Sequence, residues 1–598
     1  PPFFVGYLNG MSSLIQNGVS GQCDSSARIG VDAHSISEGR WERVCPQGML
    51  SYRQQRDVNE TLTELDVLLT GGRLSAKSKA TVEAAVADSA PGKRLQVAQQ
   101  AIAMTAEFNT LGDPLPKETP RPPPSQSPPT ASKGYKAVVM MFMGGGADTF
   151  NLIVPQDCDL YNEYRSIRTD LSLEPRELIK FTTEGQTCSN FGVHARFQFL
   201  KTLYDKGQAA FIANIGNLAA PIKDKFHRRN VESCHGLFSH SDQQNGAQTL
   251  KCQEMGTAAK GTGGRIADAL ASGKKGLRTT SFSLAGTSIW PQGWATQREI
   301  IDSRLGSGRF EGYERWRYTI DNITAQRHGN VYAEAYASAF LDAIETTEKV
   351  GQALAGVKTA TTYPTPSGLD RQLNQIAKLI RTREARKAER DFFFLTTGGW
   401  DMHSNMKQNL DRKFNEIDGA LRRFVAEMEG QKIWDKVVFV TESEFARTLD
   451  SNGGGSDHAW AGNHFIIGGS INGGRIMNKF PAALRAGNDH DLGRGRMIPE
   501  FPWESMMVPL ADWLGVSADQ EAMTFPNLAR FNRTQHIIPT HALFKEGGSG
   551  GDRSSGGEGG RGKWRLSLRA VTWSCDMAIT APHRRIWELL QLSLQKVV

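Results

Sequence analysis

Two apolar runs that enclose a polar loop constrain the fold of this chain more than any other feature. Val437–Val440 is the first run and Phe465–Ile467 is the second. The loop between them carries acids, an arginine and histidines. A buried strand that delivers such side chains from its carboxyl end is the usual way in which an open α/β sheet builds a site. The stretch from Asp435 to Gly474 therefore predicts a strand followed by a functional loop.

Three further apolar runs predict partner strands: Ala137–Met143, Ala209–Ile215 and Asp391–Leu395. Amphipathic stretches separate the runs, and the longest of them, residues 410–430, has apolar residues at helical spacing. Strands that alternate with helices favour a mostly parallel sheet covered by helices on both faces. We therefore predict an α/β fold for residues 134–545.

The composition of the remaining chain predicts its other parts. Residues 1–112 have a helical pattern and are expected to form a helical N-terminal domain that could bind a protein partner. Residues 113–133 are rich in proline and serine, which favours an extended linker. Residues 546–598 are a Gly-rich flexible segment followed by a tail to which we assign no function.

Charge and hydropathy exclude two classes of protein. The net charge of +7 over 598 residues is a mild bias, so no nucleic-acid partner is expected. No apolar run approaches the roughly 18 residues of a membrane span, so no transmembrane segment is expected. The chain begins Pro-Pro-Phe-Phe without an initiator methionine, which suggests a fragment or a processed form.

The cysteines leave two interpretations open. None of the seven forms a CxxC pair, so a thiolate zinc site is not expected. Neighbours in the sequence could pair as Cys23–Cys45, Cys158–Cys188 and Cys234–Cys252, which leaves Cys575 without a partner. Alternatively, they are buried free thiols.

Polar residues follow several of the predicted strands. Asp148 is a carboxylate at the carboxyl end of the first strand, and it is a candidate for chemistry, an Asx turn or a helix N-cap. Ser239 is a candidate nucleophile, with Ser241 second, although a serine in this segment could also cap a helix. Asp401 and His403 form an Asp-x-His pair in a Gly-rich turn, and both are good ligands for a divalent ion.

The loop of the opening stretch holds the densest group of such residues. Asp457 and His458 are adjacent, and His464 follows six residues later. Buried carboxylates and imidazoles are costly unless they are paired or bound to a metal. Metal binding or catalysis is therefore the preferred interpretation of this loop.

Six motifs resemble, in order, the landmarks of a largely bacterial family, the domain of unknown function 1501 family. They are GGGADTFN, FSHSDQQ, GGWDMHSN, ESEFART, SDHAWAGNHFIIGG and NGGRI. This family is placed in the alkaline phosphatase/sulfatase superfamily. The resemblance covers roughly residues 134–545 and implies an alkaline phosphatase-like α/β fold.

The resemblance also implies roles for single residues. Ser239 would be the nucleophile, and Arg447 would bind the phosphate or sulfate group. The run TESEFART is one residue longer than the pattern of the family, so Glu442 and Glu444 compete for one role. Two divalent ions, expected to be zinc, would be held by Asp401, His403 and His464 and by Asp148, Asp457 and His458.

The function implied by the resemblance is metal-dependent hydrolysis of small phosphoric esters, by a protein that is secreted or lies at the cell surface. No Cys/Ser-x-Pro-x-Arg segment is present, which argues against a standard sulfatase. Two alternatives stay open. One is hydrolysis of a sulfuric ester, or phosphate transfer, on the same fold. The other is a non-catalytic binding protein that is secreted or lies at the cell surface.

Overall fold

A computed structural model describes most of the chain up to residue 545. The described residues are 2–20, 29–30, 33–37, 40–44, 57–121, 134–254, 260–274, 276–304, 306–307 and 309–545. Cys23, Cys45, Cys575, residues 122–133 of the predicted linker and the whole segment 546–598 lie outside them.

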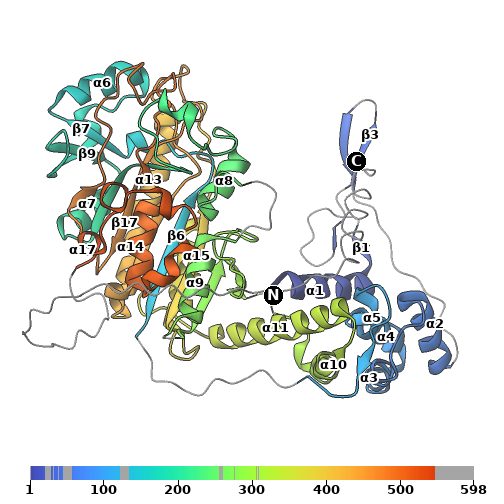
Figure 1. Ribbon diagram of the computed structural model, residues 1–598. Coiled ribbons are helices and arrows are strands. Elements are labelled where there is room, and N and C mark those ends of the chain that lie inside the picture. The colour runs from blue at the N-terminus through green and yellow to red at the C-terminus, as the bar shows by residue number, and fades with distance from the viewer. Residues whose placement is uncertain are drawn as a thin grey trace, which may run out of the picture. The chain divides into compact units, whose positions relative to one another are not determined.

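A ten-stranded sheet forms the centre of the α/β part. Its strands are β6 (Lys136–Met143), β10 (Ala209–Gly216), β11 (Thr279–Ser283), β12 (Arg298–Asp302), β13 (Gly306–Ser307), β15 (Arg390–Thr397), β16 (Val437–Glu442), β17 (Gly462–Gly468), β18 (Arg475–Met477) and β19 (Phe501–Pro502). Their order is β13-β12-β11-β15-β6-β16-β17-β10-β18, and β19 also pairs with β10. Figure 1 labels two of these strands, β6 and β17, within the α/β part.

The sheet is mostly parallel, as predicted. Strands β12, β11, β15, β6 and β16 run parallel to their neighbours in this order. The exceptions are the edge strand β13 and the inner strand β17, which is antiparallel to both β16 and β10. The four apolar runs and the second run of the opening stretch all lie in strands, so the predicted α/β fold class is confirmed.

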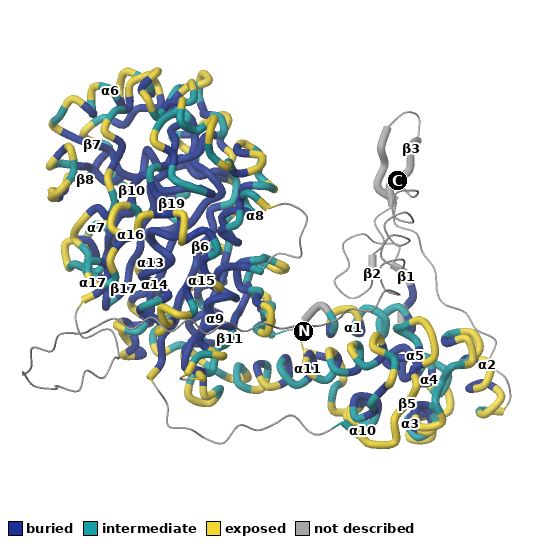
Figure 2. Tube along the Cα trace, viewed as in Figure 1, coloured by how far each residue is buried: buried dark blue, intermediate teal, exposed yellow. Residues whose placement is uncertain are grey.

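Side chains from the central strands are buried on both faces of the sheet. In β6, Val139 and Met141 pack into one hydrophobic core, while Val138 and Met140 pack into the other. Helices α7 (Gln198–Asp205), α12 (Gly368–Arg381) and α13 (Met406–Gly430) cover the first face, and α9 (Thr262–Ser272) and α14 (Glu504–Leu514) cover the second. This double burial explains why the strands read as continuous apolar runs (Figure 2).

The N-terminal helices share a hydrophobic core with two later helices. Apolar residues of α1 (Pro2–Asn17), α2 (Val58–Thr70), α3 (Ala76–Ala87) and α4 (Arg94–Ala103) pack with residues of α10 (Tyr313–Ala325) and α11 (Val331–Leu354). Phe340 and Ile344 of α11 belong to this core. Gly71, at φ 69°, is the C-cap residue that ends α2.

Two of the three predicted disulfides lie in the described residues, and both are present. Cys158–Cys188 lies beside a small sheet of β7 (Ile153–Gln156), β9 (Asn190–His194) and β8 (Leu178–Thr182). Cys234–Cys252 encloses α8 (His240–Thr249). In the part of the chain that is described, no helix is long and apolar enough to cross a membrane.

Candidate metal centre

The loops that follow β15, β6 and β16 meet at one edge of the sheet. These strands are parallel neighbours, with Thr397 opposite Met143 and Glu442 opposite Phe142, so their carboxyl ends coincide. The loop after β6 touches the loop after β15 at Gly145, which has φ 126°. A Cβ at Gly145 would lie 2.5 Å from the backbone nitrogen of Asp401. Only glycine allows this approach, which brings the two loops together.

The loop after β16 folds back on itself as a short hairpin. Ala446 N–H donates to the carbonyl of Trp460, and Thr448 N–H donates to that of Asp457. Arg447 and His458 face each other in an isolated antiparallel bridge. The hairpin therefore delivers an arginine and a histidine to the same point at the edge of the sheet.

The carboxylate of Asp401 is the centre of the site. Its Oδ1 lies 2.9 Å from His403 Nε2, 3.2 Å from His458 Nε2 and 2.6 Å from Arg447 Nη1, and its Oδ2 lies 3.5 Å from His240 Nε2. Asp401 is 43% exposed. We call Asp401, His240, His403 and His458 the Asp401 cluster.

Each histidine of the Asp401 cluster has its Nδ1 engaged by an acceptor. His458 Nδ1 lies 2.8 Å from the carbonyl oxygen of Phe238, which can only accept. His403 Nδ1 lies 3.0 Å from Asp457 Oδ1, and His240 Nδ1 lies 2.9 Å from Glu444 Oε1. The proton of a neutral imidazole is therefore assigned to Nδ1, and the Nε2 lone pair faces Asp401.

Arginines favour the ionised forms of Asp401 and Asp457. Burial alone would raise the pKa of Asp401, but the hydrogen bond and charge of Arg447, followed by His403, outweigh burial and lower this pKa. Burial likewise opposes ionisation of Asp457, whose pKa is lowered by hydrogen bonds from Arg494 and His403. The site therefore keeps its negative charge under mildly acidic conditions.

The predicted site residues fall into two groups. The structure brings together Asp401, His403, Asp457, His458 and Arg447. Two predicted ligands lie elsewhere. The buried Asp148 is paired with Arg168, and His464 lies within β17 with its ring against Trp503. Burial lowers the pKa of His464 to about 3.

Ser239 is next to the Asp401 cluster, because it precedes His240 in the chain. It is the N-cap residue of α8, but its side chain makes no capping hydrogen bond. Its Oγ lies 3.2 Å from that of Ser241. The hydroxyl is thus not committed to the helix, contrary to the capping alternative.

Sequence reasoning missed His240, although it stands inside the quoted motif FSHSDQQ. The residue comes from α8, far in sequence from the Asp-x-His and Asp-His pairs, and nothing in its neighbours distinguishes it from a surface histidine. Glu444 fixes its ring, and the same Oε1 also accepts from Gly145 N–H and Gln244 Nε2. Of the two competing glutamates, Glu444 therefore belongs to the site.

The residues present fit a divalent ion. Three Nε2 lone pairs that face one carboxylate repel it unless protons or a cation lie between them. His240, Asp401 and His458 offer ligand atoms within 4.8 Å of one another, and they are the single such group among the described residues. Two imidazoles and a carboxylate suit zinc, and acceptors on the far ring nitrogens are the usual outer partners of such ligands.

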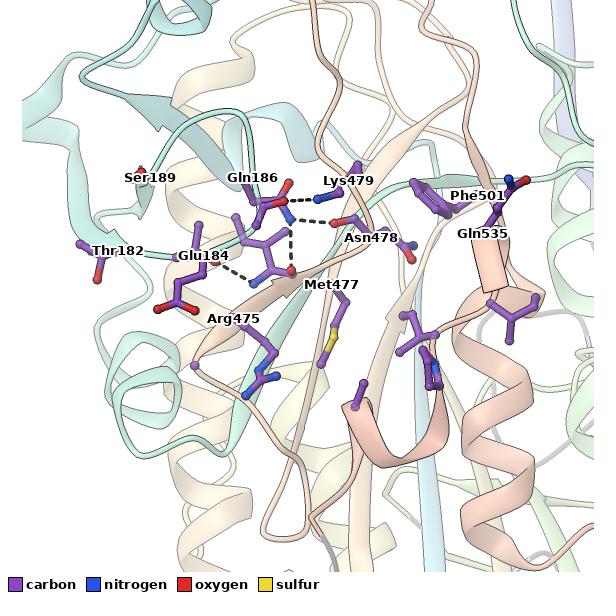
Figure 3. Close-up of a pocket in the computed structure, with 18 residues that line it drawn as sticks. Thr182, Glu184, Gln186, Ser189, Arg475, Met477, Asn478, Lys479, Phe501 and Gln535 are labelled. Carbon is purple, nitrogen blue, oxygen red and sulfur yellow. Dashed lines mark hydrogen bonds between the residues drawn. The ribbon is translucent and has the colours of Figure 1, made fainter. Parts of the chain in front are cut away.

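A separate cavity lies beside the edge strand β18. Its volume is about 1060 Å³, and none of the predicted site residues lines it. Gln186 lines this cavity, and its side chain donates to the carbonyls of Ile476 and Asn478 (Figure 3). Gln186 thereby satisfies backbone groups that an edge strand would leave open.

Comparison with protein families gives one match. Residues 294–490 match the family described as "Protein of unknown function (DUF1501)". The resemblance predicted from the motifs is thus confirmed over those residues. The matched range contains Asp401, Arg447 and His458 but not Ser239 or His240. A search of curated proteins finds no match.

Several solved structures are distantly similar. A lipoteichoic acid synthase of Listeria monocytogenes has 8% identity and a TM-score of 0.26, over 65% of this chain and 74% of that chain. The PsFucS1 sulfatase from Pseudoalteromonas sp. has 9% identity and a TM-score of 0.27, over 69% and 76%. Alkaline phosphatase from the Antarctic bacterium TAB5 has 11% identity and a TM-score of 0.20, over 56% and 92%.

Proposed function

We propose that this chain is a metal-dependent hydrolase of phosphoric esters, with one divalent ion held by His240, Asp401 and His458. The observation that carries the proposal is the convergence of three imidazole Nε2 atoms on the Asp401 carboxylate. Three protein ligands leave coordination positions open, which is typical of catalytic rather than structural sites. Because Asp148 and His464 contact other residues, the geometry supports one ion rather than two.

The residues around the ligands have separable roles. Glu444 and the Phe238 carbonyl hold two imidazoles by their Nδ1 protons, and Arg447 keeps Asp401 ionised. A bound divalent ion would supply charge stabilisation for the transferring group and lower the pKa of a coordinated hydroxyl or water. Zinc is the metal that this donor set favours.

Ser239 is the proposed nucleophile. Its Oγ would form the bond to phosphorus while the ester oxygen leaves and takes up a proton, and water would then release phosphate from the serine. Two observations support this role. The Ser239 hydroxyl makes no capping hydrogen bond, and Ser239 directly precedes the proposed ligand His240 in the chain.

The test begins with the metal content of the purified full chain, measured by mass spectrometry. We expect about one divalent ion per chain in the wild type and a large loss in Asp401→Asn and His240→Ala. His536→Ala is the matched control, because His536, in α16 (Arg533–His536), contacts Asn532 and Phe531 and not the Asp401 cluster. A wild type without a stoichiometric ion would contradict the proposal.

Activity is tested on p-nitrophenyl phosphate and p-nitrophenyl sulfate. We expect hydrolysis of the phosphate ester, loss of activity in Ser239→Ala and retention of the ion in that variant. Faster hydrolysis of the sulfate ester would reassign the substrate. Bound metal without hydrolysis of either ester would favour a binding protein instead of an enzyme.

A further inference from the structure

Arg447, the arginine expected to bind the substrate anion, is already used by the protein. Its side chain is 0% exposed. Its Nη1 donates to Asp401 Oδ1 and to the Gly145 carbonyl, and its Nη2 donates to the Ser456 carbonyl. The Arg447 guanidinium therefore holds the carboxylate of Asp401 in place, and it is too deeply buried to contact a substrate anion.

A second hairpin brings two more arginines to the site. Residues 491–497, with the sequence DLGRGRM, close through an antiparallel bridge between Asp491 and Met497. Gly493, Arg494 and Gly495 have positive φ values of 99°, 65° and 68°. A non-glycine residue in the left-handed region between two such glycines is strained, and strain of this kind is frequent at functional sites.

The hairpin is held tightly against the loop that carries Arg447. Leu449 N–H donates to the carbonyl of Gly495, and a Cβ at Gly495 would lie 2.4 Å from that of Leu449. Within the hairpin, Arg496 N–H donates to the Gly493 carbonyl. The backbone on either side of Arg496 is therefore fixed in relation to the cluster.

The two arginines of the hairpin differ in their partners. Arg494 donates to Asp450 and Asp457, so its charge is matched by two carboxylates. Arg496 donates by Nε to the carbonyl oxygen of His458 at 3.0 Å, and its guanidinium carbon lies 5.1 Å from the ring centre of Phe238. Among the described residues, neither Nη of Arg496 has a hydrogen-bond or ion-pair partner.

We propose that Arg496 is the residue that binds the tetrahedral anion of the substrate, a phosphate or sulfate group, beside the Asp401 cluster. This inference rests on the proposed function. Both residues that Arg496 contacts belong to the site, since His458 is a ligand and the Phe238 carbonyl orients it. The Nε contact and the ring hold the guanidinium plane, which leaves the paired Nη donors for two oxygens of one anion.

The test uses inorganic phosphate and, separately, inorganic sulfate as probes of the metal-loaded full chain by isothermal titration calorimetry. Arg496→Gln is expected to weaken phosphate binding by about 10–100-fold, since charge-assisted hydrogen bonds are lost. Arg496→Lys should lose less phosphate affinity than Arg496→Gln, because an ammonium keeps the positive charge but lacks the paired donors of a guanidinium. Arg485→Gln, which removes an exposed arginine paired with Glu163, should stay within about twofold.

Metal content is measured on the same samples, and the titrations are repeated after the metal is stripped with a chelator. The metal content should be equal in all variants, and Arg496→Gln should weaken anion binding in both forms. Unchanged anion affinity in both Arg496 variants, or no binding of either anion to the wild type, would overturn the inference while bound metal still supports the centre. A wild type that binds anions through Arg496 but holds no metal would refute the proposed function and leave the inference standing.

Discussion

Two glutamates in the same short run have opposite surroundings. Glu444 accepts hydrogen bonds from Gly145 N–H, His240 and Gln244. Glu442 is completely buried, and neither of its oxygens has a hydrogen-bond partner among the described residues. Burial, followed by the charge of Glu444, raises the pKa of Glu442 well above its ordinary value. Glu444 therefore anchors His240 by a hydrogen bond, whereas burial favours the protonated form of Glu442.

These surroundings predict different effects of the same substitution. Glu444→Gln should weaken metal binding by about 10–100-fold, because an amide holds His240 without the charge that strengthens its Nε2 as a ligand. Glu442→Gln is the matched control and should leave metal affinity within about twofold. A competition titration against a chelating dye measures both. Equal affinities in the wild type and Glu444→Gln would show that Glu444 does not support a ligand.

At the scale of elements, α8 depends on its boundaries rather than on a hydrophobic face. Its sequence HSDQQNGAQT has little to bury, yet it supplies His240. The Cys234–Cys252 disulfide encloses the helix, His235 N–H donates to the carbonyl of Cys252, and Gln243 donates back to the carbonyl of His235. The disulfide thus closes the loop that presents His240 to the Asp401 cluster.

Removing this disulfide should therefore affect the site as well as stability. The double variant Cys234→Ala, Cys252→Ala should lose about 2–4 kcal/mol of unfolding free energy and bind metal several-fold more weakly. The double variant Cys158→Ala, Cys188→Ala should lose similar stability but keep its metal affinity, because that disulfide lies beside the small sheet of β7, β8 and β9. Thermal unfolding and the chelator titration separate the two effects. Equal metal affinity in the two double variants would argue against this role of the Cys234–Cys252 disulfide.

Across the whole molecule, local patterns predict strands well and long-range geometry poorly. The continuous apolar runs of β6, β10, β15 and β16 follow from burial on both faces, which any reader of the sequence can detect. The Asp401, His403, Asp457 and His458 group was likewise predictable, since each pair follows a strand. The antiparallel direction of β17 was not predictable from the sequence, because it depends on which strands pair with each other.

The differences between the predicted and the observed neighbours of the site residues have the same origin. His464 follows Asp457-His458 closely in sequence, but it sits inside β17 opposite Ile212, where the strand directs its ring toward Trp503. His240 and Arg496 come from a distant helix and a distant hairpin, and only the folded chain brings them together with His458. Their local signals, a histidine between serines and an alternation of glycine and arginine, are common in other contexts.

The stability of the whole α/β part should depend on pH through Glu504, the first residue of α14. This side chain is fully buried. Burial raises its pKa to about 8, against a weaker lowering by a backbone hydrogen bond and Arg265. In the unfolded chain the carboxyl ionises near its ordinary pKa of 4.5.

The sign of the effect follows from proton counting. Between pH 4.5 and about 8 the folded protein retains the Glu504 proton while the unfolded chain releases it. The unfolded state then binds fewer protons, so the free energy of unfolding falls as pH rises through this window and levels off above it.

Glu504→Gln removes this dependence and should be more stable than the wild type by an amount that grows toward pH 8, on the order of a few kcal/mol. Urea unfolding of both proteins at several pH values, with a chelator present, gives the difference directly, because all other titrating groups are shared. A difference that stays constant from pH 5 to pH 8 would mean that Glu504 is ionised in the folded protein and that its partners compensate for burial.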